Sequence, residues 1–312
     1  MYNFFFNFQE PPFNLTPDPR FVYLSPGHQE TLEHMVYGVR ERKGFVMIVG
    51  DIGAGKTTLT RLFLDQLDEQ THTALIFNTY LNEIELLRAI NREFGLPAKG
   101  TSREDLVQIL NQFLIQVQKQ GGNAIIILDE AQNLSVAVLE QIRMLSNLET
   151  DAKKLLQIIL VGQPELARTM ARPDLAQLNQ RITVRCHLPP LDLEDTIRYI
   201  HHRLSVAGPQ NQARFHPRTY RLVHKYTEGV PRRINALCDR ALLVAFGQNS
   251  HTVTTAYIRR SWTELSGDPT VRTEHGFWNR LVFYYLVPAA MILAVIAAVG
   301  YLAYNRWEVV WR

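Results

Sequence analysis

The chain has 312 residues, of which 46% are hydrophobic and 20% charged, and its formal net charge is +3. This length allows one large domain or two ordinary ones, and the apolar content is enough to fill a substantial core. So small a net charge does not by itself indicate a nucleic-acid partner. The two cysteines, Cys186 and Cys238, have no metal-ligand spacing and argue against a disulfide framework. We interpret them as small buried apolar side chains in a protein of a reducing compartment.

The first two-thirds of the chain predict an α/β domain. Residues 1–27 are rich in proline, predict loops and lack the features of a signal peptide. Residues 28–43 have helical periodicity. Five apolar runs then predict strands, at 45–49, 74–78, 124–128, 156–161 and 182–188. Helical segments separate them, at 57–68, 82–94, 103–119 and 135–149. Strands that alternate with helices in this way predict a parallel sheet covered on both faces.

After residue 190 the strand pattern stops. Four helices are predicted, at 192–207, 217–227, 231–247 and 254–265, which together make a small helical domain. One of them carries basic residues on one face, Arg218, Arg221 and Lys225, with Arg214 just before it. A solvated charged face is the simpler interpretation, and contact with anionic lipid or nucleic acid is the alternative. His187 and the pair His201-His202 lack companions at metal-binding spacing, so we expect no metal other than Mg²⁺.

Residues 283–304 form a run of 22 residues without a charge. As a helix this run would be about 33 Å long, enough to cross the hydrocarbon core of a bilayer. Aromatic residues cluster at both of its ends, as they do at membrane interfaces. We therefore predict a transmembrane helix, preceded by a juxtamembrane linker at 267–282 and followed by a short tail at 305–312. A buried core helix is the alternative.

The segment Gly50-Asp51-Ile52-Gly53-Ala54-Gly55-Lys56-Thr57 fits the phosphate-binding pattern G-x-x-x-x-G-K-[ST]. It lies between a predicted strand and a predicted helix, as this loop requires. Its glycines let successive N–H groups turn toward the phosphates, and the helix N-terminus adds partial positive charge. Lys56 would reach the β- and γ-phosphates, and the hydroxyl of Thr57 would ligate Mg²⁺. The predicted nucleotide-binding residues are Gly50, Asp51, Ile52, Gly53, Ala54, Gly55, Lys56, Thr57 and Thr58, and the predicted cofactors are ATP and Mg²⁺.

Two acids, Asp129 and Glu130, end the apolar run at 124–128. Ligands of such sheets gather at the carboxyl ends of the strands. Asp129 would therefore lie near Mg²⁺, and Glu130 would act as general base on the attacking water. Acids at the start of a helix are the alternative reading of this pair.

A phosphate loop, an Asp-Glu pair and a following helical domain together resemble an AAA+ ATPase. The resemblance implies that Gln163 is a sensor residue, and that Arg181 is an arginine finger acting on a neighbouring subunit of a homo-oligomer. Arg185 is the second candidate for the finger. Gly229-Val230-Pro231-Arg232-Arg233-Ile234-Asn235 resembles the sensor-2 motif of the helical lid, where Arg232 matches better than Arg233. Asn78 lies where many members of the family hold the catalytic glutamate inactive.

Four motifs are similar to those of the ExeA/GspA family of general secretion pathway ATPases. They are residues 12–20, 129–134, 161–166 and 229–235. Members of this family commonly carry a cytoplasmic ATPase, one membrane span and a periplasmic peptidoglycan-binding domain. We expect the first two here, since the predicted tail is too short to fold. Related ATPases serve polysaccharide export and pilus assembly.

These features predict an AAA+ P-loop NTPase with a five-stranded parallel sheet at 28–190, a C-terminal helical lid at 191–266 and one transmembrane helix. Residues 1–27 would lie over the nucleotide site. There Phe13, Leu15 and Tyr23 would cover the adenine, unless they cap the sheet domain instead.

The predicted function is an ATPase of the bacterial inner membrane, cytoplasmic in its ATPase domain, that drives or regulates assembly of a secretion, pilus or polysaccharide-export complex. The predicted partners are further copies of the chain, proteins of that envelope complex and the membrane itself, without nucleic acid. The alternatives are a slowly hydrolysing ATP-dependent membrane switch or scaffold and a DNA-targeting ATPase of the transposition type.

Overall fold

The computed structural model describes residues 2–16, 18–98, 102–149 and 154–267. The chain divides into two compact units, Met1–Ser261 and Trp262–Arg312, and the sites discussed below belong to the first. Among the described residues, no helix combines the length and the apolar character that a membrane crossing requires. The predicted transmembrane segment at 283–304, the tail after it and residues 268–282 of the linker lie outside the described residues.

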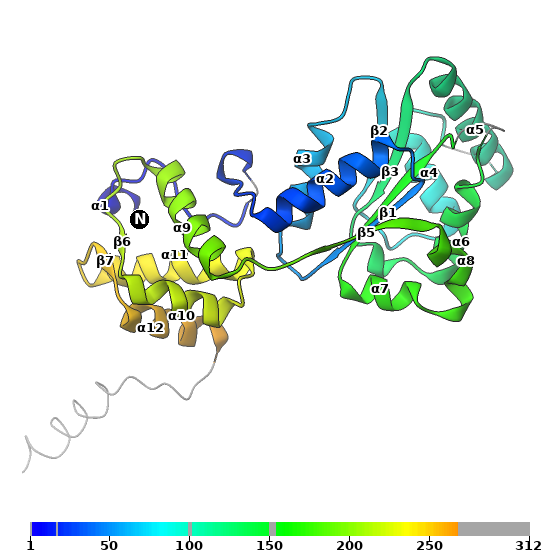
Figure 1. The fold of residues 1–312 in the computed structure, drawn as a ribbon. Helices are drawn as coiled ribbons and strands as arrows, with labels where there is room; N and C mark the ends of the chain where they lie inside the picture. The colour runs from blue at the N-terminus through cyan, green and yellow to red at the C-terminus, as the bar shows by residue number, and fades with distance from the viewer. Residues whose placement is uncertain (1, 17, 99–101, 150–153, 268–312) are drawn as a thin grey trace, which may run out of the picture. The chain divides into compact units, whose positions relative to one another are not determined.

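A five-stranded sheet forms the centre of the α/β part (Figure 1). Its strands are β1 (Phe45–Gly50), β2 (Thr71–Ile76), β3 (Asn123–Leu128), β4 (Gln157–Gly162) and β5 (Ile182–Leu188). All of them pair in parallel, in the order β2-β3-β4-β1-β5, which confirms the predicted sheet. Only β2 is displaced from its predicted range, because it is an edge strand in which only Ala74 and Ile76 are buried. A search for apolar runs therefore found its second half alone.

Helices cover both faces of the sheet, so alternate residues of each central strand enter different cores (Figure 1). On β1, Val46 and Ile48 face one core, and Phe45 and Met47 face the other. The first core is completed by α2 (Pro26–Arg40) and α3 (Lys56–Leu64). The second is completed by α4 (Glu83–Glu93), α5 (Arg103–Lys119), α6 (Val136–Leu145), α7 (Pro164–Met170) and α8 (Ala176–Arg181).

Four longer helices follow the sheet and match the predicted ones. They are α9 (Leu193–Ala207), α10 (Pro217–Thr227), α11 (Pro231–Gly247) and α12 (Thr255–Ser266). Proline occupies the first turn of α10 and of α11, where its missing N–H costs no helical hydrogen bond. The sequence did not predict β6 (Arg214–Phe215) and β7 (Thr252–Val253), because strands of two residues show no periodicity. We call residues 191–261 the helical region.

The remaining elements are short. They are α1 (Asn3–Phe6) and the 3-10 turns η1 (Pro19–Phe21), η2 (Ala131–Asn133) and η3 (Pro173–Leu175). Like α7 and α8, they are too short to show the apolar periodicity from which a helix is predicted.

The aromatic N-terminus packs on the helical region. The ring of Phe5 stacks on that of His251 with centroids 4.2 Å apart, and Phe6 is fully buried. The hydroxyl of Tyr2 donates a hydrogen bond to Asp239. Phe13 is buried with its ring 6.5 Å from that of Phe215, so it neither caps the sheet nor borders the cavity described below. Aromatic burial of this kind fastens the first 13 residues to the helical region.

Gly229 fixes the point where the chain enters the helical region. Its φ is +73°, its carbonyl accepts a hydrogen bond from the N–H of Leu191, and a Cβ on it would lie 1.9 Å from the oxygen of Leu191. Gly95 has a similar φ of +72° with no atom within 4 Å of such a Cβ. Gly95→Ala therefore measures the cost of an alanine in the left-handed region alone, without the clash that Gly229→Ala adds.

We expect Gly229→Ala to lower the free energy of unfolding by about 3 kcal/mol or more, against about 1 kcal/mol for Gly95→Ala. Urea unfolding of the two variants measures the difference. Equal losses would show that the approach of Leu191 imposes no constraint.

Candidate functional site

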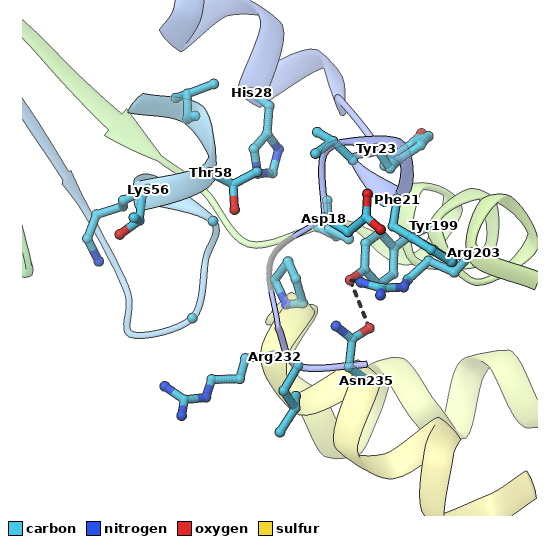
Figure 2. Close-up of a pocket in the computed structure, with 18 of the residues that line it drawn as sticks. Asp18, Phe21, Tyr23, His28, Lys56, Thr58, Tyr199, Arg203, Arg232 and Asn235 are labelled. Carbon is cyan, nitrogen blue, oxygen red and sulfur yellow. Dashed lines mark hydrogen bonds between the residues drawn. The ribbon is translucent and has the colours of Figure 1, made fainter. Parts of the chain in front are cut away.

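A cavity of about 390 Å³ opens beside the loop that follows β1 (Figure 2). Its lining comes from the N-terminal segment between residues 14 and 28, the loop and first turns of α3, Glu130 after β3, Leu191, the middle of α9 and the start of α11. Of the predicted site residues, Ile52, Gly53, Gly55, Lys56, Thr57, Thr58, Glu130 and Arg232 line this cavity. The fold thus brings residues from both ends of the first compact unit to one place.

The loop between β1 and α3 has the shape of an anion cradle. Gly53 and Gly55 have φ values of +82° and +104°, which a side chain would strain. Gly50 is needed for a different reason, since a Cβ there would lie 3.0 Å from the carbonyl oxygen of Leu188. No side chain caps the N-terminus of α3, so its first N–H groups are free to bind an anion.

Lys56 is buried at the start of α3, and its ammonium group is held by backbone oxygens. Its Nζ donates to the carbonyls of Gly50 at 2.8 Å and Asp51 at 3.0 Å. Burial lowers the pKa of Lys56, against the opposing charges of Glu130 and Asp129. A buried cation without a close carboxylate partner among the described residues is suited to a negatively charged ligand.

The hydroxyl of Thr57 donates a hydrogen bond to Oδ2 of Asp129 at 2.8 Å. This contact joins the start of α3 to the end of β3, across 72 residues of sequence. Asp129 is only 2% exposed. A hydroxyl and a carboxylate side by side are the hard oxygen ligands that Mg²⁺ prefers, so these two residues fit the predicted metal.

Glu130 follows directly and is held by two glutamines. Its Oε2 accepts hydrogen bonds from Nε2 of Gln132 at 2.6 Å and Nε2 of Gln163 at 3.1 Å. Gln132 also accepts the N–H of Gln163 at 3.0 Å, which ties the end of β3 to the end of β4. Burial raises the pKa of Glu130, but these hydrogen bonds and the charge of Lys56 outweigh it, so the pKa is lowered and the carboxylate is ionised.

The backbone of Glu130 has a φ of +54°, which is uncommon for a residue with a side chain. Its carbonyl accepts a hydrogen bond from the hydroxyl of Thr79 at 3.0 Å. Asn78 instead uses its side-chain oxygen to accept the N–H of Tyr80, so Gln132 and Gln163, and not Asn78, contact the carboxylate. Gln132 belongs to the motif at residues 129–134, but nothing in that motif predicts its hydrogen bond to the carboxylate of Glu130.

Comparison with known proteins agrees with this geometry. Residues 39–170 match a family model described as an AAA domain. The chain is 42% identical over 293 residues to the general secretion pathway protein A of Aeromonas hydrophila, an alignment that covers 94% of this chain and 53% of that protein. This chain is an AAA+ protein related to general secretion pathway protein A. It spans about half the length of that relative.

Solved structures show the same fold. The ORC2 protein of Aeropyrum pernix, in its ADPNP-ADP complexes, superposes with a TM-score of 0.61 at 18% identity, over 82% of this chain and 72% of that one. Cdc6p of Pyrobaculum aerophilum gives a TM-score of 0.59 at 16% identity, over 80% and 71% of the two chains. At such low identity the likeness concerns the fold of this AAA+ protein alone.

Among the arginines predicted for this AAA+ site, Arg232 alone borders the cavity. Its N–H donates to the carbonyl of Gly53 at 3.3 Å, and its side chain extends toward the side where Lys56 lies (Figure 2). Arg233 forms an exposed ion pair with Glu228 instead. This arrangement favours Arg232 as the residue that reaches a bound phosphate.

Arg181 lies outside the cavity, at the end of α8. Its Nη1 donates to Oγ of Ser146 and Oδ1 of Asn147, both at 2.6 Å. Arg185 donates to the carbonyl and the side-chain oxygen of Asn179, both at 2.7 Å. Neither arginine lines the cavity of its own chain.

Sequence reasoning missed His28, which contacts the phosphate loop at the carbonyl of Ala54. Its Nδ1 lies 2.6 Å from the hydroxyl of Ser25 and its Nε2 lies 3.1 Å from the carbonyl of Ala54. The carbonyl of Ala54 requires a donor, so the neutral ring donates from Nε2 and accepts from Ser25 at Nδ1. Burial lowers the pKa of His28, against the hydrogen bond to Ala54 and the charge of Asp195. A lone histidine in a helix gives no sequence signal for such a role.

His28 should make stability depend on pH. Its folded-state pKa lies below the ordinary value of 6.5, so under that pH the unfolded chain binds more protons than the folded chain. The stability that neutral His28 contributes is complete above pH 6.5 and declines as the pH falls toward the folded-state pKa. We expect wild type to lose on the order of 1 kcal/mol more than His28→Gln between about pH 7.5 and pH 5.5.

Urea unfolding at the two pH values measures this loss. Glutamine can still donate to Ala54 but does not titrate, which makes it the matched control. Identical pH dependence in the two proteins would mean that His28 is not held neutral.

Proposed function

We propose that this protein binds ATP with Mg²⁺ and hydrolyses it to ADP and phosphate. One observation carries the proposal. Lys56, Thr57 and Glu130 line the same cavity, and Thr57 is hydrogen-bonded to Asp129. The relationship to general secretion pathway protein A and the AAA domain support it.

The loop and Lys56 would bind the phosphates. The free N–H groups at the start of α3 would donate to the phosphate oxygens, and Lys56 would exchange the carbonyls of Gly50 and Asp51 for the β- and γ-phosphates. Arg232 would reach the same phosphates from the start of α11. Thr57 and Asp129 would hold Mg²⁺, which neutralises charge on the phosphates when bound.

Glu130 would orient the attacking water and accept its proton. Its lowered pKa keeps the carboxylate ionised, as a base must be. Gln163 lies at hydrogen-bonding distance from that carboxylate, so it would report the state of the γ-phosphate by exchanging one partner for the other. Arg181 would act on the site of a neighbouring copy, after leaving Ser146 and Asn147.

The setting we propose is the inner membrane of a bacterium, with residues 1–280 on the cytoplasmic side. Residues 283–304 would anchor the chain, residues 28–190 would form the ATPase domain and residues 191–266 would act as its lid. The relative is a general secretion pathway protein, so the cycle would drive or regulate assembly of a secretion, pilus or polysaccharide-export complex.

Substitution of Glu130 tests the enzyme. We expect the full-length protein in lipid nanodiscs to release phosphate from ATP, and Glu130→Gln to lower that rate by a factor of about 100 or more while ATP still binds. Lys56→Ala should weaken ATP binding itself. Arg233→Ala, at an exposed ion pair, is the matched control and should retain the wild-type rate. Equal turnover by wild type and Glu130→Gln would contradict the assignment.

A second candidate is a membrane switch that binds ATP and hydrolyses it very slowly. The clamp of Gln132 and Gln163 on Glu130 favours it, because a carboxylate that accepts two amide hydrogen bonds has less capacity to bind water. This candidate predicts negligible turnover with membranes and partner proteins present, and faster turnover in Gln132→Leu. Slower turnover in that variant would favour the ATPase.

A further inference from the structure

Three buried polar side chains meet at the end of the cavity away from Lys56 (Figure 2). Tyr199 and Arg203 come from α9, and Asn235 comes from the first turns of α11. Each is only 6% exposed, and each lines the cavity. Buried polar groups are normally hydrogen-bonded. The donors and acceptors that the internal hydrogen bonds of these three residues leave unused are therefore the ones available to a ligand.

Arg203 is fixed in place by backbone carbonyls, and no carboxylate of the described residues forms an ion pair with it. Its Nε donates to the carbonyl of Pro12 at 2.6 Å and its Nη2 to the carbonyl of Asn14 at 3.1 Å. Its guanidinium also lies over the ring of Phe21, 4.9 Å from the centroid. These contacts hold the group rigidly and leave Nη1 directed at Tyr199.

The hydrogen bonds between the three residues form a chain that runs from Arg203 through Tyr199 to Asn235. Nη1 of Arg203 lies 3.0 Å from the hydroxyl of Tyr199, and a guanidinium can only donate. The hydroxyl accepts there and donates its own proton to Oδ1 of Asn235 at 2.8 Å. Burial raises the pKa of Tyr199, so the phenol keeps that proton.

The amide of Asn235 is oriented as a result. Its oxygen faces Tyr199, and its nitrogen faces the cavity interior in Figure 2. That nitrogen makes no hydrogen bond within the part of the chain that the structure describes. Asn235 therefore offers a ligand an N–H donor at this point of the cavity wall.

We propose that Asn235 selects the base of the nucleotide by donating a hydrogen bond to an unprotonated ring nitrogen, N1 of adenine. The inference rests on the proposed ATP binding and adds the residue that recognises the base. A nucleotide with its phosphates at Lys56 would direct its base toward this end of the same cavity. The apolar side chains of Phe21, Val22 and Leu191 line the space around it.

Guanine carries a hydrogen on N1, so two donors would face each other and both would stay unpaired. A site built around one hydrogen bond rejects a ligand that cannot complete it, because its own buried group is then left without a partner. Arg203 and Tyr199 are positioning residues in this scheme, since they act on the base only through the orientation of Asn235.

Equilibrium binding to the full-length protein in nanodiscs tests the inference, with ATP, GTP and 1-deaza-ATP, in which a C–H replaces N1. We expect wild type to bind 1-deaza-ATP about 10-fold more weakly than ATP, and GTP at least as weakly. Asn235→Leu should bind ATP about 10-fold more weakly and no longer distinguish it from 1-deaza-ATP. Asn235→Asp, which accepts instead of donating, should shift preference from ATP toward GTP.

Two controls separate this role from a structural one. Tyr199→Phe should reduce the preference for ATP over 1-deaza-ATP, because the amide is then free to rotate. Inorganic tripolyphosphate should bind wild type and Asn235→Leu equally, since the phosphate end is intact.

Equal binding of ATP and 1-deaza-ATP by wild type would overturn the inference and leave the ATPase proposal standing. ATP binding with these preferences but without turnover would overturn the ATPase instead. Failure to bind any nucleotide would overturn both.

Discussion

The position of β4, paired in parallel between β1 and β3, is the constraint on which the site depends. Three loops leave the same edge of the sheet because parallel strands end on the same side. The phosphate loop, the Asp129–Glu130 pair and Gln163 therefore meet, although they are distant in sequence. The alternate burial of β1 residues in two cores favours this register, since a shift by one residue would exchange the side chains of the two cores.

The hydrogen bonds around Glu130 and Lys56 pair charged groups with neutral ones. Lys56 is buried and Glu130 half-buried, and each is bonded to neutral groups that a ligand can replace. Lys56 donates to two backbone carbonyls, and Glu130 accepts from two side-chain amides. Neither group needs a large movement to change partners, so the cradle is largely pre-formed. Gln132 links the loops that follow β3 and β4, because its side-chain oxygen accepts the N–H of Gln163.

The sequence was sufficient for the parts that depend on local pattern. Apolar runs located the five strands, and the loop pattern located Gly53, Gly55 and Lys56, because phosphate binding constrains neighbouring residues. It failed where a role depends on contact between distant segments. Gln132, His28 and the Arg203–Tyr199–Asn235 chain have no spacing that marks them, and Phe13 could have served either of two surfaces. The strands of the sheet could be predicted because each is an apolar run that is recognisable from its own residues.

Two stretches of backbone connect the helical region with the sheet, one after η1 and one after β5. They lie side by side, since a Cβ on Gly27 would come within 2.7 Å of the ring of Pro189. Ser25 and His28 lie at this same crossing, and His28 contacts the phosphate loop at the carbonyl of Ala54. Prolines lie on both connections, at 26 and at 189–190, and restrict their backbone. A movement of the helical region relative to the sheet would therefore strain this crossing, where His28 contacts the phosphate loop.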